Sequence, residues 1–143
     1  MTVASILAEK GRAVFTTSPD TLLSEAVDQL ATKRVGAIVV TDAKGRVAGI
    51  VSERDIVREL SRKGTSVLDR PISECMTHKV LTCGESDTVD SVMSVMTANR
   101  FRHLPVVSDG KLAGIISIGD VVKRKIEQAE RDAEHLRNYI AMS

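Results

Sequence analysis

The chain has 143 residues, of which 20 are Lys or Arg and 19 are Asp or Glu, so its formal net charge is only +1. This balance provides no overall field that would attract nucleic acid or an anionic membrane. Aromatic residues make up 2 % of the sequence, so the core must be aliphatic and few side chains are available to stack on single-stranded bases.

The first half of the chain predicts a strand, a helix, a hairpin and a second helix. An apolar lead-in at residues 3–7 precedes a short β-run at residues 14–16. Two further strands, at residues 37–40 and 47–51, flank an Asp/Gly-containing turn, and a helix is expected from about Arg54. Between the first two strands, apolar residues spaced three and four apart predict a helix: Leu22, Leu23, Ala26, Val27 and Leu30.

The second half predicts the same elements in the same order. A lead-in at residues 72–76 precedes a β-run at residues 80–82, and strands at residues 104–107 and 112–116 form another hairpin. A final helix is expected from about Gly119. The helix between the first strand and the hairpin is indicated by the spacing of its apolar residues, Val89, Val92, Met93 and Met96.

The two halves align along their length, so the chain contains an internal repeat. Residues 14–16 align with residues 80–82, and after a gap of one residue in the hairpin turn, residues 47–52 align with residues 112–117. A unit of about 60 residues is only marginally stable alone. We therefore expect an α+β fold in which two β-α-β-β-α units pack sheet to sheet, with boundaries at 1–66 and 67–122.

Residues 123–143 are expected to extend the last helix. Its apolar positions follow steps of four and three, which is a short heptad-like pattern: Val122, Ile126, Ala129, Ala133, Leu136 and Ile140. Two interpretations remain open, a helix docked on its own domain and a dimer contact. The basic triplet at residues 123–125 is followed by acidic residues, which favours a solvated mixed-charge surface over a nucleic-acid patch.

The most informative motif is Gly-Ile-Val-Ser-x-x-Asp at residues 49–55, which recurs as Gly-Ile-Ile-Ser-x-x-Asp at residues 114–120. In one interpretation, Ser and Asp form a capping box at the start of a helix. In the other, the helix N-terminus and Ser contact a phosphate, Asp accepts hydrogen bonds from ribose hydroxyls, and Gly lets the ligand approach the strand. Both interpretations are compatible with the residues.

From about Val3 to Val122, the chain resembles the CBS-domain family, whose tandem pairs form Bateman modules. The resemblance is carried by residues 47–56 and 112–121, with support from residues 102–107. It implies a regulatory module that binds an adenosine-containing ligand between the repeats (AMP, ADP, ATP, NAD(H) or S-adenosylmethionine), with AMP or another adenine nucleotide expected. It also implies a homodimer and an unknown protein effector, and no catalytic cofactor.

By this resemblance, Asp55 and Asp120 hold ribose, Ser52 and Ser117 lie near phosphate, and the opening strand of each repeat lines the base pocket. A basic cluster in the second half suits a phosphate, although a solvated surface stripe is the alternative. Because the halves differ at these positions, we expect two inequivalent sites. The candidate site residues are Thr16, Gly36, Ala37, Ser52, Arg54, Asp55, Lys79, Val80, Arg100, Arg102, His103, Pro105, Ser117 and Asp120.

Two other classes of function were weighed. A structural scaffold with vestigial sites would need Ser and Asp only as helix caps. An enzyme is not expected, because no His lies in metal-ligand spacing and there is no P-loop or nucleophile elbow. No apolar run reaches the roughly 20 residues of a membrane span, and a signal-peptide pattern is lacking. We therefore expect a cytoplasmic protein with no metal, in which Cys75 and Cys83 are free thiols.

Overall fold

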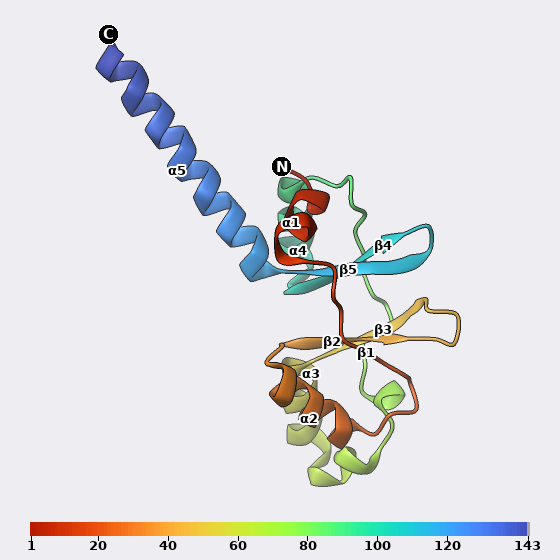
Figure 1. Ribbon diagram of the computed structural model, residues 1–143. Helices are drawn as coiled ribbons and strands as arrows, with labels where there is room; N and C mark the ends of the chain where they lie inside the picture. The colour runs from red at the N-terminus through yellow and green to blue at the C-terminus, as the bar shows by residue number, and fades with distance from the viewer. Residues whose placement is uncertain (143) are drawn as a thin grey trace.

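In the computed structural model, which describes residues 1–142, two small β-sheets lie between two layers of helices (Figure 1). The first sheet has the order β1-β2-β3, with β1 parallel to β2 and β2 antiparallel to β3. The second sheet is the antiparallel pair β4-β5. The strands are β1 (Thr16–Thr17), β2 (Ala37–Thr41), β3 (Val47–Ser52), β4 (His103–Ser108) and β5 (Lys111–Ser117).

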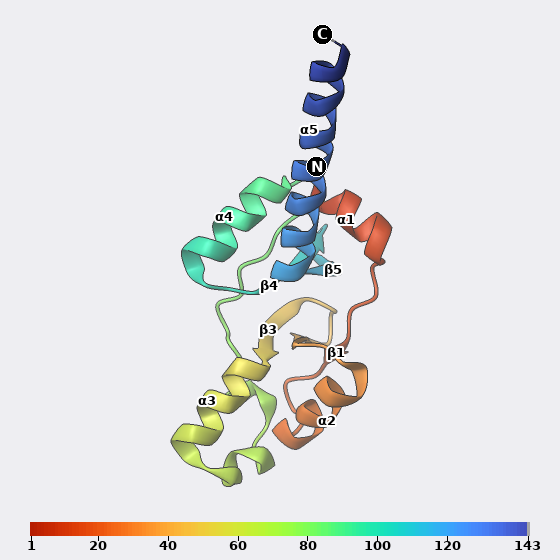
Figure 2. The ribbon, with the colours of Figure 1, turned by 90° about the vertical axis from the view of Figure 1, so that its left-hand side faces the viewer.

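Helices cover the outer face of each sheet, so the two sheets face each other as the repeat predicted (Figures 1 and 2). The equivalent helices α2 and α4 bury one apolar face each, and each ends at an arginine in the left-handed conformation, Arg34 (φ 54°) and Arg100 (φ 58°). The helices are α1 (Val3–Lys10), α2 (Leu23–Lys33), α3 (Glu53–Lys63), α4 (Val89–Asn99) and α5 (Ile118–Met142), with 3₁₀ turns η1 (Thr65–Asp69) and η2 (Ile72–Glu74).

Each half of the molecule takes part of its core from the lead-in of the other half. The N-terminal helix α1 packs in the hydrophobic cluster of the second repeat, and η2 packs in that of the first. The motif glycines accommodate these lead-ins: a Cβ at Gly49 would lie 2.5 Å from Met76 Sδ, and one at Gly114 would lie 2.8 Å from Leu7 Cδ2. The space beside each motif glycine therefore holds a core side chain, and not a ligand as the sequence suggested.

One predicted strand is absent from the second sheet. Residues 80–82 form no strand, and only Cys83 makes a parallel bridge to β4. In the first repeat, Val39 N–H donates to Phe15 O at 3.3 Å. Pro105 occupies the equivalent position in the second repeat and has no N–H to donate, so the same pairing cannot form.

The last helix projects beyond the body of the molecule (Figures 1 and 2). Its first turns touch the domain: Arg124 donates to Ser5 O at 2.9 Å, and Lys125 donates to Asp90 at 2.8 Å. From Ala129 to Met142 every described residue is exposed, so docking on its own domain holds only for the start of the helix. Within residues 1–142, no helix combines the length and the apolar character that crossing a membrane requires.

Both cysteines are free and buried. Burial raises the pKa of the Cys75 thiol, and it raises the pKa of Cys83 to about 11. Both groups are therefore protonated at neutral pH and are poor nucleophiles.

Candidate functional site

The first Ser-x-x-Asp motif forms a capping box where β3 passes into α3. Asp55 N–H donates to Ser52 Oγ at 3.3 Å, while Asp55 Oδ2 accepts from Ser52 N–H at 2.9 Å and from Ser52 Oγ at 3.0 Å. Arg58, one turn further along the helix, donates to Asp55 Oδ1 at 2.7 Å. Asp55 is 8 % exposed and is the one buried charged residue within residues 1–142.

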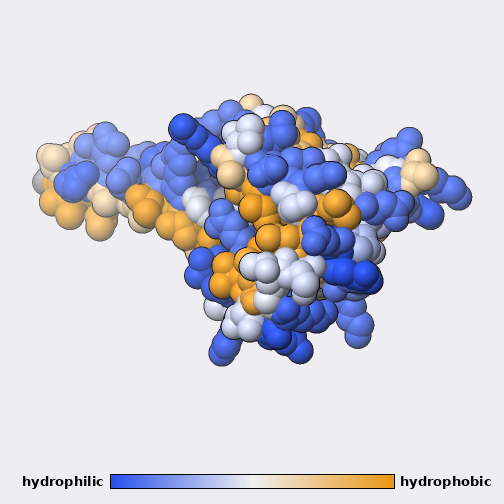
Figure 3. All heavy atoms as spheres, turned by 90° about the horizontal axis from the view of Figure 1, so that it is seen from below, coloured by the Kyte–Doolittle hydropathy of each residue, from blue (hydrophilic) through white to orange (hydrophobic). Residues whose placement is uncertain are grey.

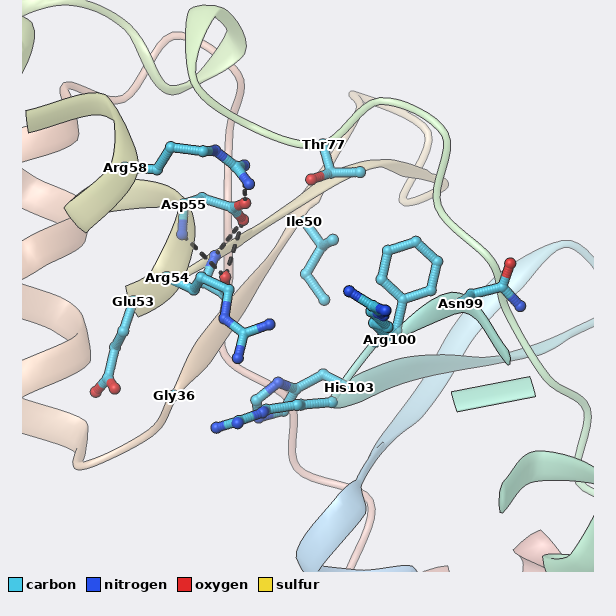
Figure 4. Close-up of a pocket in the computed structure, with 13 residues that line it drawn as sticks. Gly36, Ile50, Glu53, Arg54, Asp55, Arg58, Thr77, Asn99, Arg100 and His103 are labelled. Carbon is cyan, nitrogen blue, oxygen red and sulfur yellow. Dashed lines mark hydrogen bonds and ion pairs between the residues drawn. The ribbon is translucent and has the colours of Figure 1, made fainter. Parts of the chain in front are cut away.

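This carboxylate borders a cavity of about 400 Å³ between the two repeats. Figure 4 shows Arg54 and Asp55 of α3 on one side of the opening, with Arg100 and His103 of the second repeat on the other. The lining residues are Gly36, Ile50, Ser52, Glu53, Arg54, Asp55, Arg58, Thr77, Asn99, Arg100, Phe101, Arg102 and His103. Four arginines against two carboxylates give the cavity a net positive charge, which suits a phosphate or another anion.

The two walls of the cavity are held together across the interface. The ring of His103 packs on Gly36, where a Cβ would lie 3.3 Å from His103 Cε1. Burial lowers the pKa of His103, and the positive charge of Lys10 lowers it further, more than the nearby carboxylates raise it. The imidazole is therefore neutral at pH 7, and the cationic character of the cavity comes from its arginines.

The second motif has the same cap but a different cation. Asp120 Oδ2 accepts from Ser117 N–H at 2.8 Å, and Asp120 N–H donates to Ser117 Oγ at 3.2 Å. Lys10, in the last turn of α1, donates to Asp120 Oδ2 at 2.7 Å and to Ile115 O at 3.0 Å. Burial alone would raise the pKa of Asp120, but the bonds from Lys10 and Ser117 outweigh it and hold that pKa below its usual value.

The structure divides the candidate residues into two groups. Those that line the cavity are Gly36, Ser52, Arg54, Asp55, Arg100, Arg102 and His103. Those that lie outside its lining are Thr16, Ala37, Lys79, Val80, Pro105, Ser117 and Asp120. Ser117 and Asp120 form the second cap, and Thr16 and Pro105 lie in strands.

Several lining residues were missed by reasoning from the sequence: Ile50, Glu53, Arg58, Thr77, Asn99 and Phe101. Arg58 was detectable, because it stands three residues after Asp55 and therefore on the same face of the helix. Thr77 had no local signal, since its backbone pairs with Ile50 N–H and C=O at 3.1 and 2.9 Å through the tertiary fold. Within the described residues, no group of three or more His, Cys, Asp or Glu is arranged to hold a metal ion.

The internal repeat agrees with what comparison with known proteins shows. The family model of the CBS domain matches residues 7–62 and, a second time, residues 72–127. The chain belongs to the CBS-domain family. Its fold is that of a CBS-domain pair, and a CBS-domain containing protein from Agrobacterium tumefaciens is 46 % identical, with a TM-score of 0.85 over 87 % of this chain and 99 % of that one.

Two other solved CBS structures contain ligands. A CBS domain protein from Pyrobaculum aerophilum was solved in complex with AMP; it is 28 % identical, with a TM-score of 0.75 over 84 % of this chain and 89 % of that one. A CBS domain pair in complex with 5′-methylthioadenosine and S-adenosyl-L-methionine is 25 % identical, with a TM-score of 0.80 over 90 % of this chain and 98 % of that one. All three ligands of these relatives contain an adenosine unit.

Proposed function

We propose that this CBS-domain pair is a non-catalytic sensor that binds an adenosine-containing nucleotide, with AMP as the first candidate, in the cavity beside Asp55. The observation that carries the proposal is a buried carboxylate at a helix N-terminus, facing a cavity with four arginines. A ligand that combines a vicinal diol with an anionic group satisfies both features, and a nucleotide has both.

The ribose end of the ligand is assigned to Asp55. An ionised carboxylate has about four acceptor positions, and the structure shows Asp55 using three of them, two with Ser52 and one with Arg58. The Arg58 side chain is 53 % exposed, so it can move into solvent when ribose hydroxyls take its place. The helix cap formed with Ser52 holds the carboxylate in position throughout.

The phosphate end is assigned to the start of α3 and the cations that face it. A helix N-terminus presents unpaired N–H groups to an anion, and Arg54 lies in that first turn. Arg100 and Arg102 reach the same cavity from the second repeat. Because these groups come from both halves, a bound phosphate would bridge the repeats and couple ligand binding to their relative position.

The base is assigned to the less polar part of the cavity, between Ile50 and Phe101. A volume of about 400 Å³ lies within the range of small-molecule sites.

The scaffold alternative finds its best support at the second motif, where Lys10 already pairs with Asp120. We infer one working site per chain, a cytoplasmic location, and output through a second copy and an unidentified protein effector.

The proposal is tested by a thermal-shift titration with AMP, ADP, ATP, NADH and S-adenosylmethionine. At one hundred times Kd, a ligand that binds only the native state adds about 2.7 kcal/mol. For a domain of this size the melting temperature should rise by roughly 9 °C. We expect a saturable rise with at least one of these ligands, lost in Asp55→Asn and kept in Asp120→Asn. No rise with any of the five would favour the scaffold.

A further inference from the structure

The projecting part of α5 carries an uncovered apolar seam, which we define as Val122, Ile126, Ala129, Ala133, Leu136 and Ile140. All six residues are exposed, and Ile126, Leu136 and Ile140 are 54–63 % exposed. In Figure 3 hydrophobic side chains follow one side of the projecting helix. The match to the CBS-domain model ends at residue 127, so most of this seam lies beyond the family's shared fold.

The chain's own domain contacts a different face of α5. Val121 is buried, and Arg124 and Lys125 bond to the body. At about 100° per residue, Val121, Arg124 and Lys125 lie about 100°, 160° and 60° from the centre of the seam, all on the same side of it. The seam is therefore free to meet a partner while the start of the helix stays docked. A helical extension of this length is marginal in water without such packing.

The spacing of the seam indicates how it packs. Steps of four, three, four, three and four average to the 3.5-residue repeat of a left-handed coiled coil. Ile126, Ala133 and Ile140 then take position a, and Val122, Ala129 and Leu136 take position d. Ile126 and Ile140 at a, together with Leu136 at d, fit the pattern that favours two strands.

Charges beside the seam select the partner and the orientation. In a parallel, in-register pair, each g residue faces the e residue five positions later on the other helix. This places Asp132 against the partner's Arg137 and Lys125 against the partner's Glu130. Both pairs join opposite charges and are attractive. Lys125 is ion-paired with Asp90 of its own chain, whereas Arg137 is exposed and Asp132 accepts a hydrogen bond from the neutral Gln128, so the first pair carries more of the selection.

The antiparallel alternative is unfavourable where it covers the whole seam. It would place Glu130 against the partner's Glu130, Asp132 against the partner's Asp132 and Lys123 against the partner's Arg137. Like charges at these positions repel. Antiparallel pairs shifted by one heptad avoid the repulsion, but they cover four of the six apolar layers.

We propose that α5 forms a parallel, in-register, two-stranded coiled coil with α5 of a second copy of this chain. The occupant of the seam is thus the protein itself, and the assembly does not depend on nucleotide. Both CBS pairs would then lie at the same end of the coiled coil.

The first test is sedimentation equilibrium of the full chain without nucleotide. The wild-type protein should be a dimer at about 50 µM. Leu136→Asp should raise the dimer dissociation constant about 100-fold or more, because it places a charge in a packed layer of both helices. The matched control is Asn138→Asp, which adds the same charge at an outward position f and should leave the constant within about twofold. A cooperative thermal unfolding transition in each variant would show that both remain folded.

The second test fixes the orientation. A cysteine at position 136 faces its own copy only in the parallel pair, so Leu136→Cys should form a disulfide-linked dimer on mild oxidation, while Asn138→Cys should not. The native cysteines are buried and do not compete. A monomeric wild type, a dimer unaffected by Leu136→Asp, or a dimer in which Leu136→Cys fails to cross-link would each overturn the proposal.

Discussion

The two Ser-x-x-Asp motifs share a helix cap and differ in the cation that faces the carboxylate. Asp55 is paired with Arg58, which belongs to the same helix and is largely exposed. Asp120 is paired with Lys10, which comes from the other end of the chain and is also tied to a backbone carbonyl. The duplicated motif thus keeps the same local structure, while the cation that pairs with its carboxylate differs between the two copies.

The cavity beside the first motif is completed by the second repeat. Arg100, Arg102 and His103 lie directly before and in β4, yet they line the opening next to α3. The corresponding residues of the first repeat include Gly36, whose lack of a side chain makes room for His103. Each repeat therefore supplies two of the four arginines, and the first repeat also supplies the buried carboxylate, so the lining of the cavity depends on both repeats.

The largest difference in stability should come from removing each carboxylate. Asp55→Ala should lower the free energy of unfolding by about 3 kcal/mol, because it removes a buried cap and leaves Ser52 N–H without its acceptor. Asp120→Ala should cost about 1–2 kcal/mol, because that cap is more exposed. Urea unfolding at pH 7 measures both. Equal losses would mean that the two caps are energetically equivalent despite their different burial.

A ligand that lacks one ribose hydroxyl should sharpen the difference further. We expect 2′-deoxy-AMP to bind about tenfold more weakly than AMP, because a hydrogen bond to a charged carboxylate contributes about 1.5 kcal/mol or more. In Asp55→Asn the ratio of the two affinities, AMP over 2′-deoxy-AMP, should fall to about twofold, whereas Asp120→Asn should keep the tenfold ratio. Competition titration measures these ratios. Discrimination that survives in Asp55→Asn would place the ribose elsewhere.

Removing Lys10 should make the two motifs more alike. Lys10→Met leaves Asp120 without its internal cation, so we expect a second, weaker AMP-binding event, with an affinity within about tenfold of the first. Arg12→Met is the matched control, because Arg12 pairs with Glu85 and not with Asp120. Calorimetry reports the stoichiometry. One site per chain in both variants would show that Lys10 is not what closes the second motif.

The smallest expected effect is a pH dependence specific to the second motif. The folded pKa of Asp120 lies below its unfolded value of about 3.9. Its contribution to stability is therefore present above that pH and is lost as the pH falls through the folded pKa. The difference in unfolding free energy between wild type and Asp120→Asn should be about 1 kcal/mol at pH 7 and should vanish as the pH falls below the folded pKa of Asp120. A difference that stays constant with pH would contradict the assigned contact.

The repeat made most of the fold predictable from the sequence. The apolar spacing located α2 and α4, and the paired hairpins located β2 to β5, because these elements depend on local pattern. The capping boxes followed from the Ser-x-x-Asp spacing alone. The missing strand at residues 80–82 was also within reach, since Pro105 stands where the first repeat uses a backbone N–H.

The candidate site was only partly predictable, because its lining and the partners of its carboxylates come from distant parts of the chain. Lys10 and Asp120 are separated by 110 positions, and nothing in the sequence around Lys10 marks it as the partner of Asp120. The packing of each lead-in segment in the core of the other half likewise depends on the tertiary fold and has no local signal. Thr16 and Lys79 were nominated by resemblance alone, and the structure places neither in the lining of the cavity.

The most direct test of one working site is isothermal titration calorimetry with AMP on the wild type, Asp55→Asn and Asp120→Asn. The amide keeps the size of the side chain and an acceptor for the cap, so both variants should remain folded. We predict one AMP per wild-type chain, a loss of affinity of at least about 100-fold in Asp55→Asn, and a change within about threefold in Asp120→Asn. Binding that survives in Asp55→Asn and disappears in Asp120→Asn would contradict the assignment of the site.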